Sequence, residues 1–261
     1  MKRKNQYDVI IIGGGHAGTE ACSASARMGL KTLLVTHNTE KIGEMSCNPA
    51  IGGLGKGHLV REIDALDGVM GRAIDSSGIQ FRMLNLSRGQ AVRGPRAQAD
   101  RSLYKSAIAK ILKEQENLTI CEGSVEDIIL KNNSVIGIVL EKGEKIYSKT
   151  VVLTTGTFLR GMVRTGNESF PAGRIGDKPS LNLAKRIEEL KFSIGRLKTG
   201  TPPRINKKSI NFNDLEEQHA DKKPIPFSFV NKFIHIPQIS CFLTYTNEKT
   251  HQIIKNNLLL S

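Results

Sequence analysis

The pattern of apolar positions in the first forty residues predicts a strand, a glycine turn, a helix and a second strand. Val9–Ile12 is an uninterrupted apolar run, typical of a parallel strand that is buried on both faces. The small and helix-favouring residues of 19–28 predict a helix, and 31–35 predicts the next parallel strand. A strand, a helix and a second parallel strand in this order indicate an α/β fold.

Beyond residue 35, helical spacing and short apolar runs predict the remaining elements. We expect helices at 59–70, 103–115, 181–190 and 247–260, and strands at 118–121, 124–130, 135–140, 144–147 and 150–157. Residues 88–95 are expected to form a loop that becomes helical after Pro95. The order of a βαβ unit, a helix, a β-meander and a returning strand is that of flavoproteins with two dinucleotide-binding folds. We therefore expect a Rossmann-like FAD-binding domain at 1–200 and the start of an inserted α+β domain at 201–261.

The turn between the first strand and the first helix carries the glycine spacing G-x-G-x-x-G. Gly13 allows a tight turn, Gly15 lets a pyrophosphate approach the backbone, and Gly18 lets the helix pack close to the sheet. The free N–H groups of the helix N-terminus then face the phosphates. A dinucleotide site is the favoured interpretation, and a glycine-rich turn in another α/β protein is the alternative.

The end of the second strand departs from the dinucleotide fingerprint. An acidic residue commonly binds a ribose hydroxyl there. This chain has Thr36, His37 and Asn38 instead. Thr36 or Asn38 could supply the same hydrogen bond.

A glycine-rich stretch at 43–59 contains the candidate reactive cysteine, Cys47. Its five glycines indicate a loop that follows a ligand surface, and it lacks the serine or threonine of a phosphate-binding Walker loop. A thiol near a flavin and a basic residue can ionise and act as a nucleophile or redox group. A packed, inert cysteine is the alternative, and the sequence does not decide between them.

Composition and charge indicate a polyanionic partner. The formal net charge is +13, with 38 Lys and Arg against 25 Asp and Glu. Nucleic acid is the first candidate, and simple solubility is the alternative. Two basic segments, 82–105 and 196–208, would hold nucleic-acid phosphates, with Arg196, Lys198 and Arg204 in the second.

The cysteine spacing and the hydropathy exclude several classes of protein. The four cysteines are far apart and form no C-x-x-C pair, so we expect no metal site and a reducing, cytoplasmic environment. No apolar run approaches the roughly 20 residues that a membrane span needs, so we expect no membrane partner.

Several of these motifs together resemble one family. They are IIGGGHAGTEA, MSCNPAIGG, GKGHLV, GIQFR, RAQADR, VVLTTGTF and GRLKTGTPPRI. They resemble the MnmG or GidA family, FAD-dependent enzymes that modify the wobble uridine of tRNA. The resemblance covers essentially the whole chain.

This resemblance implies a cofactor, partners and site residues. Together with a GTPase, MnmE, the family adds an aminomethyl or carboxymethylaminomethyl group at carbon 5 of the uridine, using NADH and methylenetetrahydrofolate. Its members form homodimers. The implied FAD contacts are Gly13, Gly14, Gly15, His16, Ala17, Gly18, Val125 and Ser180. Cys47 matches a functional cysteine, and Arg174 matches a loop that is presented to tRNA.

Family members run well beyond Ser261, into a segment with a second functional cysteine and a helical C-terminal domain. The apolar end, NNLLLS, lacks a glycine cap. We therefore expect an N-terminal fragment, so that whether the chain is an enzyme by itself stays open. Two alternatives also remain: a non-catalytic FAD-binding remnant, and a general flavin-dependent oxidoreductase.

Overall fold

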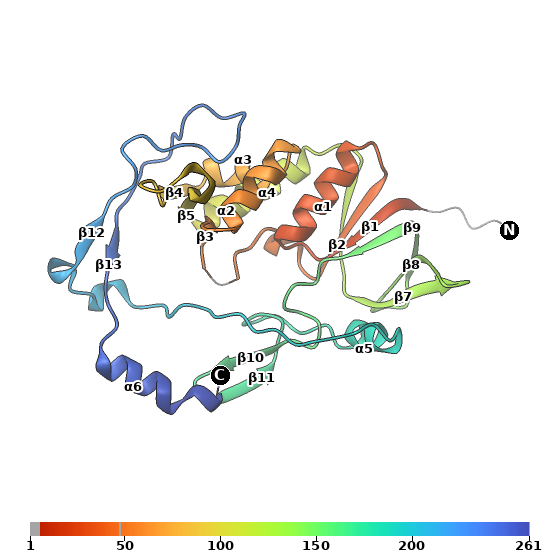
Figure 1. The fold of residues 1–261 in the computed structure, drawn as a ribbon. Helices are drawn as coiled ribbons and strands as arrows, with labels where there is room; N and C mark the ends of the chain where they lie inside the picture. Colours follow the sequence, from red (N-terminus) through yellow and green to blue (C-terminus); the bar gives the residue numbers. More distant parts are fainter. Residues whose placement is uncertain (1–5, 47, 261) are drawn as a thin grey trace.

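The computed structural model describes residues 6–46 and 48–260, and its largest sheet, of six strands, lies on the right-hand side of Figure 1. Its strand order is β6-β2-β1-β9-β8-β7. The strands are β1 (Tyr7–Ile12), β2 (Thr32–Thr36), β6 (Leu118–Glu122), β7 (Val125–Lys131), β8 (Ser134–Leu140) and β9 (Lys145–Leu153). Neighbours among β6, β2, β1 and β9 pair in parallel, whereas β8 is antiparallel to both β7 and β9.

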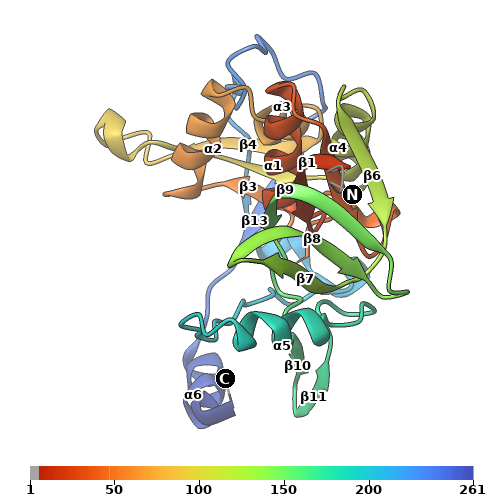
Figure 2. The ribbon, with the colours of Figure 1, turned by 90° about the vertical axis from the view of Figure 1, so that its right-hand side faces the viewer.

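The alternation of side chains along β1 divides the core into two layers. Val9 and Ile11 face one side of the sheet and pack in a cluster with residues of α1 (His16–Arg27) and α4 (Arg101–Lys113). Ile10 and Ile12 face the other side, where they pack in a cluster with residues of β7 and β8, because the sheet curls beyond β9 (Figure 2). We call β7, β8 and β9 the β-meander. Successive side chains of a strand point to opposite faces, so both sides of β1 must be covered. This explains why β1 is apolar throughout.

The predicted strands at 144–147 and 150–157 are one element in the structure. The first part of β9 pairs with β8, and the part from Ser148 pairs with β1. Ser148 is buried, and its hydroxyl donates to the carbonyl oxygen of Thr150 at 2.9 Å. A single strand therefore belongs to both the meander and the parallel part of the sheet. The polar residues Ser148 and Lys149 made the two parts look separate in the sequence.

A second, three-stranded sheet of order β3-β5-β4 lies beside the helices, formed by β3 (Ala50–Gly52), β4 (Gly78–Leu84) and β5 (Gly94–Ala99). The loop predicted at 88–95 is confirmed up to residue 93, where it contains η2 (Gln90–Val92), but the helix predicted after Pro95 is wrong: β5 occupies this stretch, and the helix begins at Arg101. Gly94 and Pro95 are poor strand formers, and they are tolerated here because they begin β5, where only β4 pairs with them; β3 pairs with the later residues of the strand.

The single helix predicted at 59–70 is also wrong, because two helices occupy this region. They are α2 (Lys56–Ala65) and α3 (Met70–Asp75). The carboxylate of Glu20, on α1, accepts hydrogen bonds of 2.7–3.1 Å from the N–H groups of Val69 and Met70. This distant carboxylate satisfies the N-terminus of α3. α2 ends locally, because the N–H groups of Asp67 and Gly68 donate to the carbonyl oxygens of Asp64 and Ile63.

The C-terminal third contains short elements joined by long irregular segments. They are β10 (Met162–Thr165), β11 (Glu168–Pro171), α5 (Asn182–Glu189), β12 (Glu216–Gln218), β13 (Cys241–Leu243) and α6 (Glu248–Asn256). α5 packs against the meander through Leu183. Residues 191–206 contain no helix or strand and run across the molecule (Figure 1). No helix in the described ranges is long and apolar enough to cross a membrane.

Residues 221–239 pack onto the N-terminal part of the chain. Phe227 is fully buried in the same cluster as Val9 and Ile11. The buried carboxylate of Asp75 accepts hydrogen bonds from the N–H groups of Phe227 and Ser228 at 2.7 and 2.9 Å. The predicted division into 1–200 and 201–261 stays a prediction, and this contact joins the two predicted parts.

Candidate dinucleotide-binding site

The glycine turn after β1 is the most constrained part of the candidate site. A Cβ on Gly13, whose φ is +108°, would lie 2.5 Å from the carbonyl oxygen of Thr154. A Cβ on Gly18 would lie 1.8 Å from the carbonyl oxygen of Gly13. A Cβ on Gly15 would meet nothing within 4 Å. Gly13 and Gly18 are therefore required for packing within the protein, whereas Gly15 leaves space on the open side of the turn.

The N-terminus of α1 is available to an anion. Gly15 is its N-cap residue, no side chain caps the helix, and its first turn contains no acidic residue. Gly15 and Ala17 are exposed. Free N–H groups and the positive end of the helix dipole favour a phosphate at this position. The turn therefore fits the pyrophosphate of a dinucleotide, whose oxygens would accept hydrogen bonds from the free N–H groups at the start of α1.

The carboxyl ends of β2 and β6 bring Val125 toward the same edge of the sheet. The N–H of Gly123, just after β6, donates to the carbonyl oxygen of Thr36, the last residue of β2, at 2.9 Å. Val125 begins β7 two residues later and is buried. In open α/β sheets, ligands bind at the carboxyl ends of the strands. The predicted position of Val125 is thus on the ligand-binding edge.

Ser180 reaches this edge from a distant part of the chain. Its hydroxyl lies 3.4 Å from Nε2 of His37, the residue after β2. Its N–H donates to the carbonyl oxygen of Phe158 at 2.9 Å, and the His37 and Phe158 rings meet edge to face at 5.4 Å. Sequence reasoning missed His37, although it occupies the place where an acidic residue commonly binds ribose.

Of the two polar residues that the sequence suggested as ribose ligands, Asn38 has another partner, whereas Thr36 lies beside the glycine turn. The Asn38 side chain accepts a hydrogen bond from the N–H of Glu40 and caps η1 (Thr39–Lys41). A Cβ on Gly14 would lie 3.0 Å from the Thr36 hydroxyl, so this hydroxyl is close to the glycine turn. A nearby carboxylate, that of Glu122 at the end of β6, accepts from the N–H and hydroxyl of Thr39. These hydrogen bonds lower the pKa of Glu122.

His16 is enclosed within the fingerprint. Its ring meets the buried ring of Tyr104 edge to face at 5.6 Å, and its Nδ1 is buried without a hydrogen-bond partner. Burial, with a smaller contribution from the charge of Lys56, lowers the pKa of His16 to about 4. His16 is therefore neutral at pH 7. It packs beside α4, and its contact with a cofactor stays a prediction.

The glycines of the 43–59 stretch divide into two groups. A Cβ on Gly52 or Gly57 would lie 2.1 or 2.5 Å from the carbonyl oxygen of Pro95, and one on Gly43 would meet Ile108. Gly53 and Gly55 have positive φ values and open space. Three of the five glycines thus serve internal packing, and only Gly53 and Gly55 have space for a ligand.

Cys47 lies outside the described residues, so its role stays a prediction. The chain on both sides of it is fixed: the carbonyl oxygen of Met45 accepts a hydrogen bond from Arg101, and that of Pro49 accepts one from the N–H of Ala99 at 2.6 Å. By contrast, Cys22 is buried in α1, and burial raises its pKa to about 12. Cys22 is therefore unsuited to act as a nucleophile.

The predicted nucleic-acid residues lie in two environments. Arg174 is largely enclosed, with its side chain 17% exposed and its Nε 2.7 Å from the carboxylate of Asp177. Arg196, Lys198 and Arg204 lie in the exposed segment 191–206, where Arg196 donates to the carbonyl oxygen of Arg160 at 3.3 Å. The exposed segment suits a polyanion better than the environment of Arg174 does.

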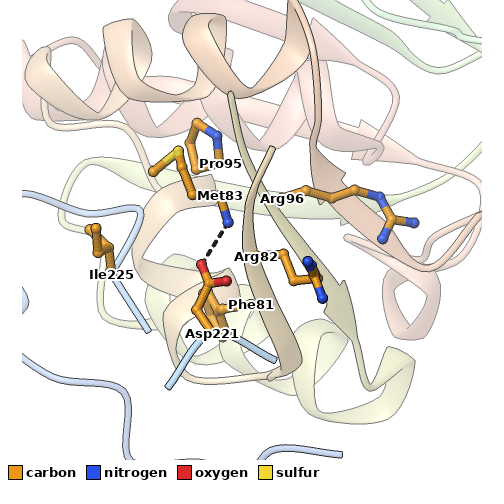
Figure 3. A pocket seen from close by; sticks show the side chains of 7 residues that line it. All are labelled: Phe81, Arg82, Met83, Pro95, Arg96, Asp221 and Ile225. Carbon is orange, nitrogen blue, oxygen red and sulfur yellow. Dashed lines mark hydrogen bonds between the residues drawn. The ribbon is translucent and has the colours of Figure 1, made fainter. Parts of the chain in front are cut away.

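Arg82, in the basic segment, lines two hollows: an open one of about 620 Å³ along residues 82–87, and a much smaller one that Arg96 also lines. Arg82 and Arg96 are paired across β4 and β5 and extend to one side, whereas Met83, Asp221 and Ile225 lie on the other (Figure 3). The N–H of Met83 donates to Asp221 at 2.7 Å. The cavity between these residues has a volume of about 10 Å³, enough for about one water molecule.

Comparison with known proteins identifies the family of the chain. Residues 8–261 match the family model described as glucose inhibited division protein A, GidA. The chain is 58% identical over 255 residues to a tRNA uridine 5-carboxymethylaminomethyl modification enzyme, MnmG, from Granulibacter bethesdensis; the match covers 97% of this chain and 40% of that protein.

Solved structures show the same fold. The structure of Aquifex aeolicus GidA in a second crystal form has a TM-score of 0.92 at 48% identity, covering 97% of this chain and 43% of that one. A GidA-related protein from Thermus thermophilus, at a TM-score of 0.53 and 19% identity, shares the fold alone. The chain spans about two fifths of the length of the GidA proteins it matches. The Rossmann-like FAD-binding fold expected from the sequence is confirmed, and the chain belongs to the GidA family.

Proposed function

We propose that this chain is the FAD-binding part of an enzyme that modifies the wobble uridine of tRNA at carbon 5. The observation that carries the proposal is the glycine turn, open at Gly15, within a chain that is 58% identical to an MnmG enzyme. The chain covers 40% of that enzyme. The activity of the whole enzyme is therefore proposed for this chain acting together with the part of the enzyme that it does not cover.

The proposed cofactor is FAD, which would supply the redox chemistry of the reaction. The N–H groups of Gly13–Gly18 would bind its pyrophosphate, and Val125 and Ser180 would border its adenosine. The available helix N-terminus and the open space at Gly15 support this assignment. NADH and methylenetetrahydrofolate are proposed as cosubstrates from the resemblance to the family.

The proposed role of Cys47 is nucleophilic. Its thiolate would add to carbon 6 of the uracil ring, forming a C–S bond and moving the electron pair of the 5,6 double bond onto the carbonyl at carbon 4. Carbon 5 then becomes nucleophilic and would attack the methylene carbon of the folate in its iminium form, so that a C–C bond forms and the electron pair of the C=N bond moves onto the folate nitrogen. Loss of the carbon 5 proton and expulsion of the thiolate restore the double bond.

The proposed macromolecular substrate is tRNA, bound through phosphate contacts. The net charge of +13 and the exposed residues Arg196, Lys198 and Arg204 support this role, with Arg174 as a further candidate. Binding of this kind weakens steeply as salt increases. A homodimer, the MnmE GTPase as partner and a cytoplasmic location complete the proposal.

Two experiments test the function. Purified protein is titrated with FAD, and binding is followed by flavin fluorescence and visible absorbance; the proposal expects a saturable complex. The chain is then mixed with the C-terminal part of the 58% identical MnmG enzyme, and the MnmE GTPase, the cosubstrates and tRNA are added. Modified uridine is measured by mass spectrometry.

Within that reconstituted system, Cys47→Ser is expected to abolish product without changing FAD binding, whereas Cys241→Ser is the control. Protein that binds FAD but yields no product with the added parts would favour the non-catalytic remnant. Turnover of a small acid that is unchanged by Cys47→Ser would favour a general oxidoreductase.

A further inference from the structure

A cluster of opposite charges lies beside the candidate cofactor site, centred on Asp177. One carboxylate oxygen of Asp177 accepts a hydrogen bond from Nζ of Lys41 at 2.5 Å, and the other accepts one from Nε of Arg174 at 2.7 Å. Arg174 also lies 3.9 Å from the carboxylate of Glu44. The Asp177 and Arg174 side chains are only 15% and 17% exposed.

The backbone around Asp177 forms a tight turn that leads to Ser180. The N–H of Asp177 donates to the carbonyl oxygen of Arg174 at 2.9 Å, and its carbonyl oxygen accepts from the N–H of Gly173 at 3.1 Å. Ser180 is fixed in turn by Phe158 and Arg160, through hydrogen bonds of 2.9 and 3.1 Å. These backbone hydrogen bonds hold the 173–180 turn in one conformation, so that Ser180 and Asp177 keep a fixed relative position.

Lys41 lies across from the 173–180 turn, in the segment that follows β2; we call residues 37–43 the β2 wall of the site. It ends η1, which follows β2 and His37. Two residues later, the N–H of Gly43 donates to the carbonyl oxygen of Gly14 in the glycine turn at 2.9 Å. The Lys41–Asp177 ion pair therefore links the β2 wall, which contains His37, to the 173–180 turn, which contains Ser180.

We propose that Asp177 is a positioning residue for the adenosine end of the cofactor, because its contact with Lys41 holds Ser180 beside His37 at the end of β2. The inference rests on the proposed function, since it assumes a dinucleotide at this edge. In this arrangement the His37–Ser180 pair presents a ring nitrogen and a hydroxyl where an acidic residue commonly binds ribose.

The enclosure of the cluster explains why this ion pair matters more than one on the surface. Exposed pairs contribute little, because water and salt screen them. Around Asp177, burial raises the carboxyl pKa, but the hydrogen bonds from Lys41 and Arg174 outweigh it and lower the pKa below its usual value. The carboxylate is thus ionised at neutral pH and holds two cations.

Calorimetric titration of the full chain with ADP and with FAD tests the proposal. Asp177→Asn, which keeps the shape of the side chain, is expected to weaken both ligands at least tenfold, and Lys41→Gln is expected to do the same. If the two residues act through one contact, the double variant binds no more than about threefold more weakly than either single variant. Asp177→Glu is expected to recover part of the affinity.

The matched control is Asp67→Asn, which removes an acid that pairs with Arg27, the last residue of α1, and with Arg72 of α3. It is expected to leave ADP and FAD binding unchanged. Thermal unfolding of each ligand-free variant separates positioning from loss of the fold, and Lys41→Gln keeps the test decisive if Asp177→Asn unfolds.

Three results would overturn the proposal. If both single variants bind ADP and FAD as tightly as the unaltered protein, Asp177 does not position the site, while the proposed cofactor stands. If their losses multiply in the double variant, the two residues act independently. If the unaltered protein binds neither ligand, the proposed function fails and this inference fails with it.

Discussion

The hydroxyl of Ser180 lies 3.4 Å from Nε2 of His37, although 143 residues separate the two positions. His37 follows the second parallel strand, and Ser180 follows an irregular turn beyond the returning strand. Their contact lies at the end of β2, at the same edge of the sheet as the glycine turn after β1. The candidate site is thus built from three segments that only the fold brings together.

Two glycines of the same fingerprint are expected to fail in different ways when changed to alanine. Gly15→Ala adds a Cβ in open space, so the free energy of unfolding should change by less than about 1 kcal/mol. That Cβ occupies the side from which a pyrophosphate approaches, so ADP and FAD should bind at least tenfold more weakly. Urea unfolding and ligand titration measure the two effects.

Gly18→Ala places its Cβ 1.8 Å from a backbone oxygen, so it should destabilise the fold by about 3 kcal/mol. Gly195→Ala, at an exposed position with open space, is the control for both variants. Equal stability of the Gly15 and Gly18 variants would contradict the assigned division of roles.

His16 should make stability depend on pH. Its pKa is about 4 in the folded protein, from burial first and the Lys56 charge second, against 6.5 when unfolded. The unfolded chain therefore takes up the proton first as pH falls. Stability from neutral His16 is complete above pH 6.5 and is lost toward pH 4, by about 2 kcal/mol at pH 5.

The check on this pH dependence is urea unfolding of the unaltered protein and of His16→Gln at pH 7.5 and pH 5. The variant should lose about 2 kcal/mol less over this interval. His235→Asn, at an exposed position, should behave like the unaltered protein. Parallel pH profiles for the unaltered protein and His16→Gln would show that burial of His16 does not control acid stability.

The exposed basic segment should account for part of the salt dependence of tRNA binding. Changing Arg196, Lys198 and Arg204 to glutamine should reduce the slope of log affinity against log salt by about 0.7–0.9 for each phosphate contact that is lost. A triple variant of Lys131, Lys142 and Lys145, exposed on the meander, changes the net charge equally. An equal reduction in both variants would indicate a general charge effect.

Phe227 should be the main apolar anchor of residues 221–239. Its side chain is fully buried and its ring lies 6.3 Å from that of Phe81. Phe227→Ala should therefore cost about 3–5 kcal/mol of unfolding free energy, whereas Phe233→Ala, at a position 70% exposed, should cost less than about 1 kcal/mol. Similar denaturant midpoints for the two variants would show that this segment is not part of the main core.

The sequence by itself determined the β-α-β start, the glycine turn, the meander and the basic character of the chain. These features follow from local rules: apolar runs, helical spacing and glycine positions depend on neighbours within a few residues. The family resemblance added Val125 and Ser180, and both lie near the carboxyl end of β2 in the structure.

Only the tertiary structure decided the features that depend on distant partners. Glu20 binds the start of α3 from another helix, and β5 pairs with two strands although it begins with two poor strand formers. Gly52 and Gly57 are required by the approach of Pro95. His37 becomes a candidate only when Ser180 lies beside it. Such contacts are absent from local sequence, because the residues that make them meet only after the sheet and its covering layers have formed.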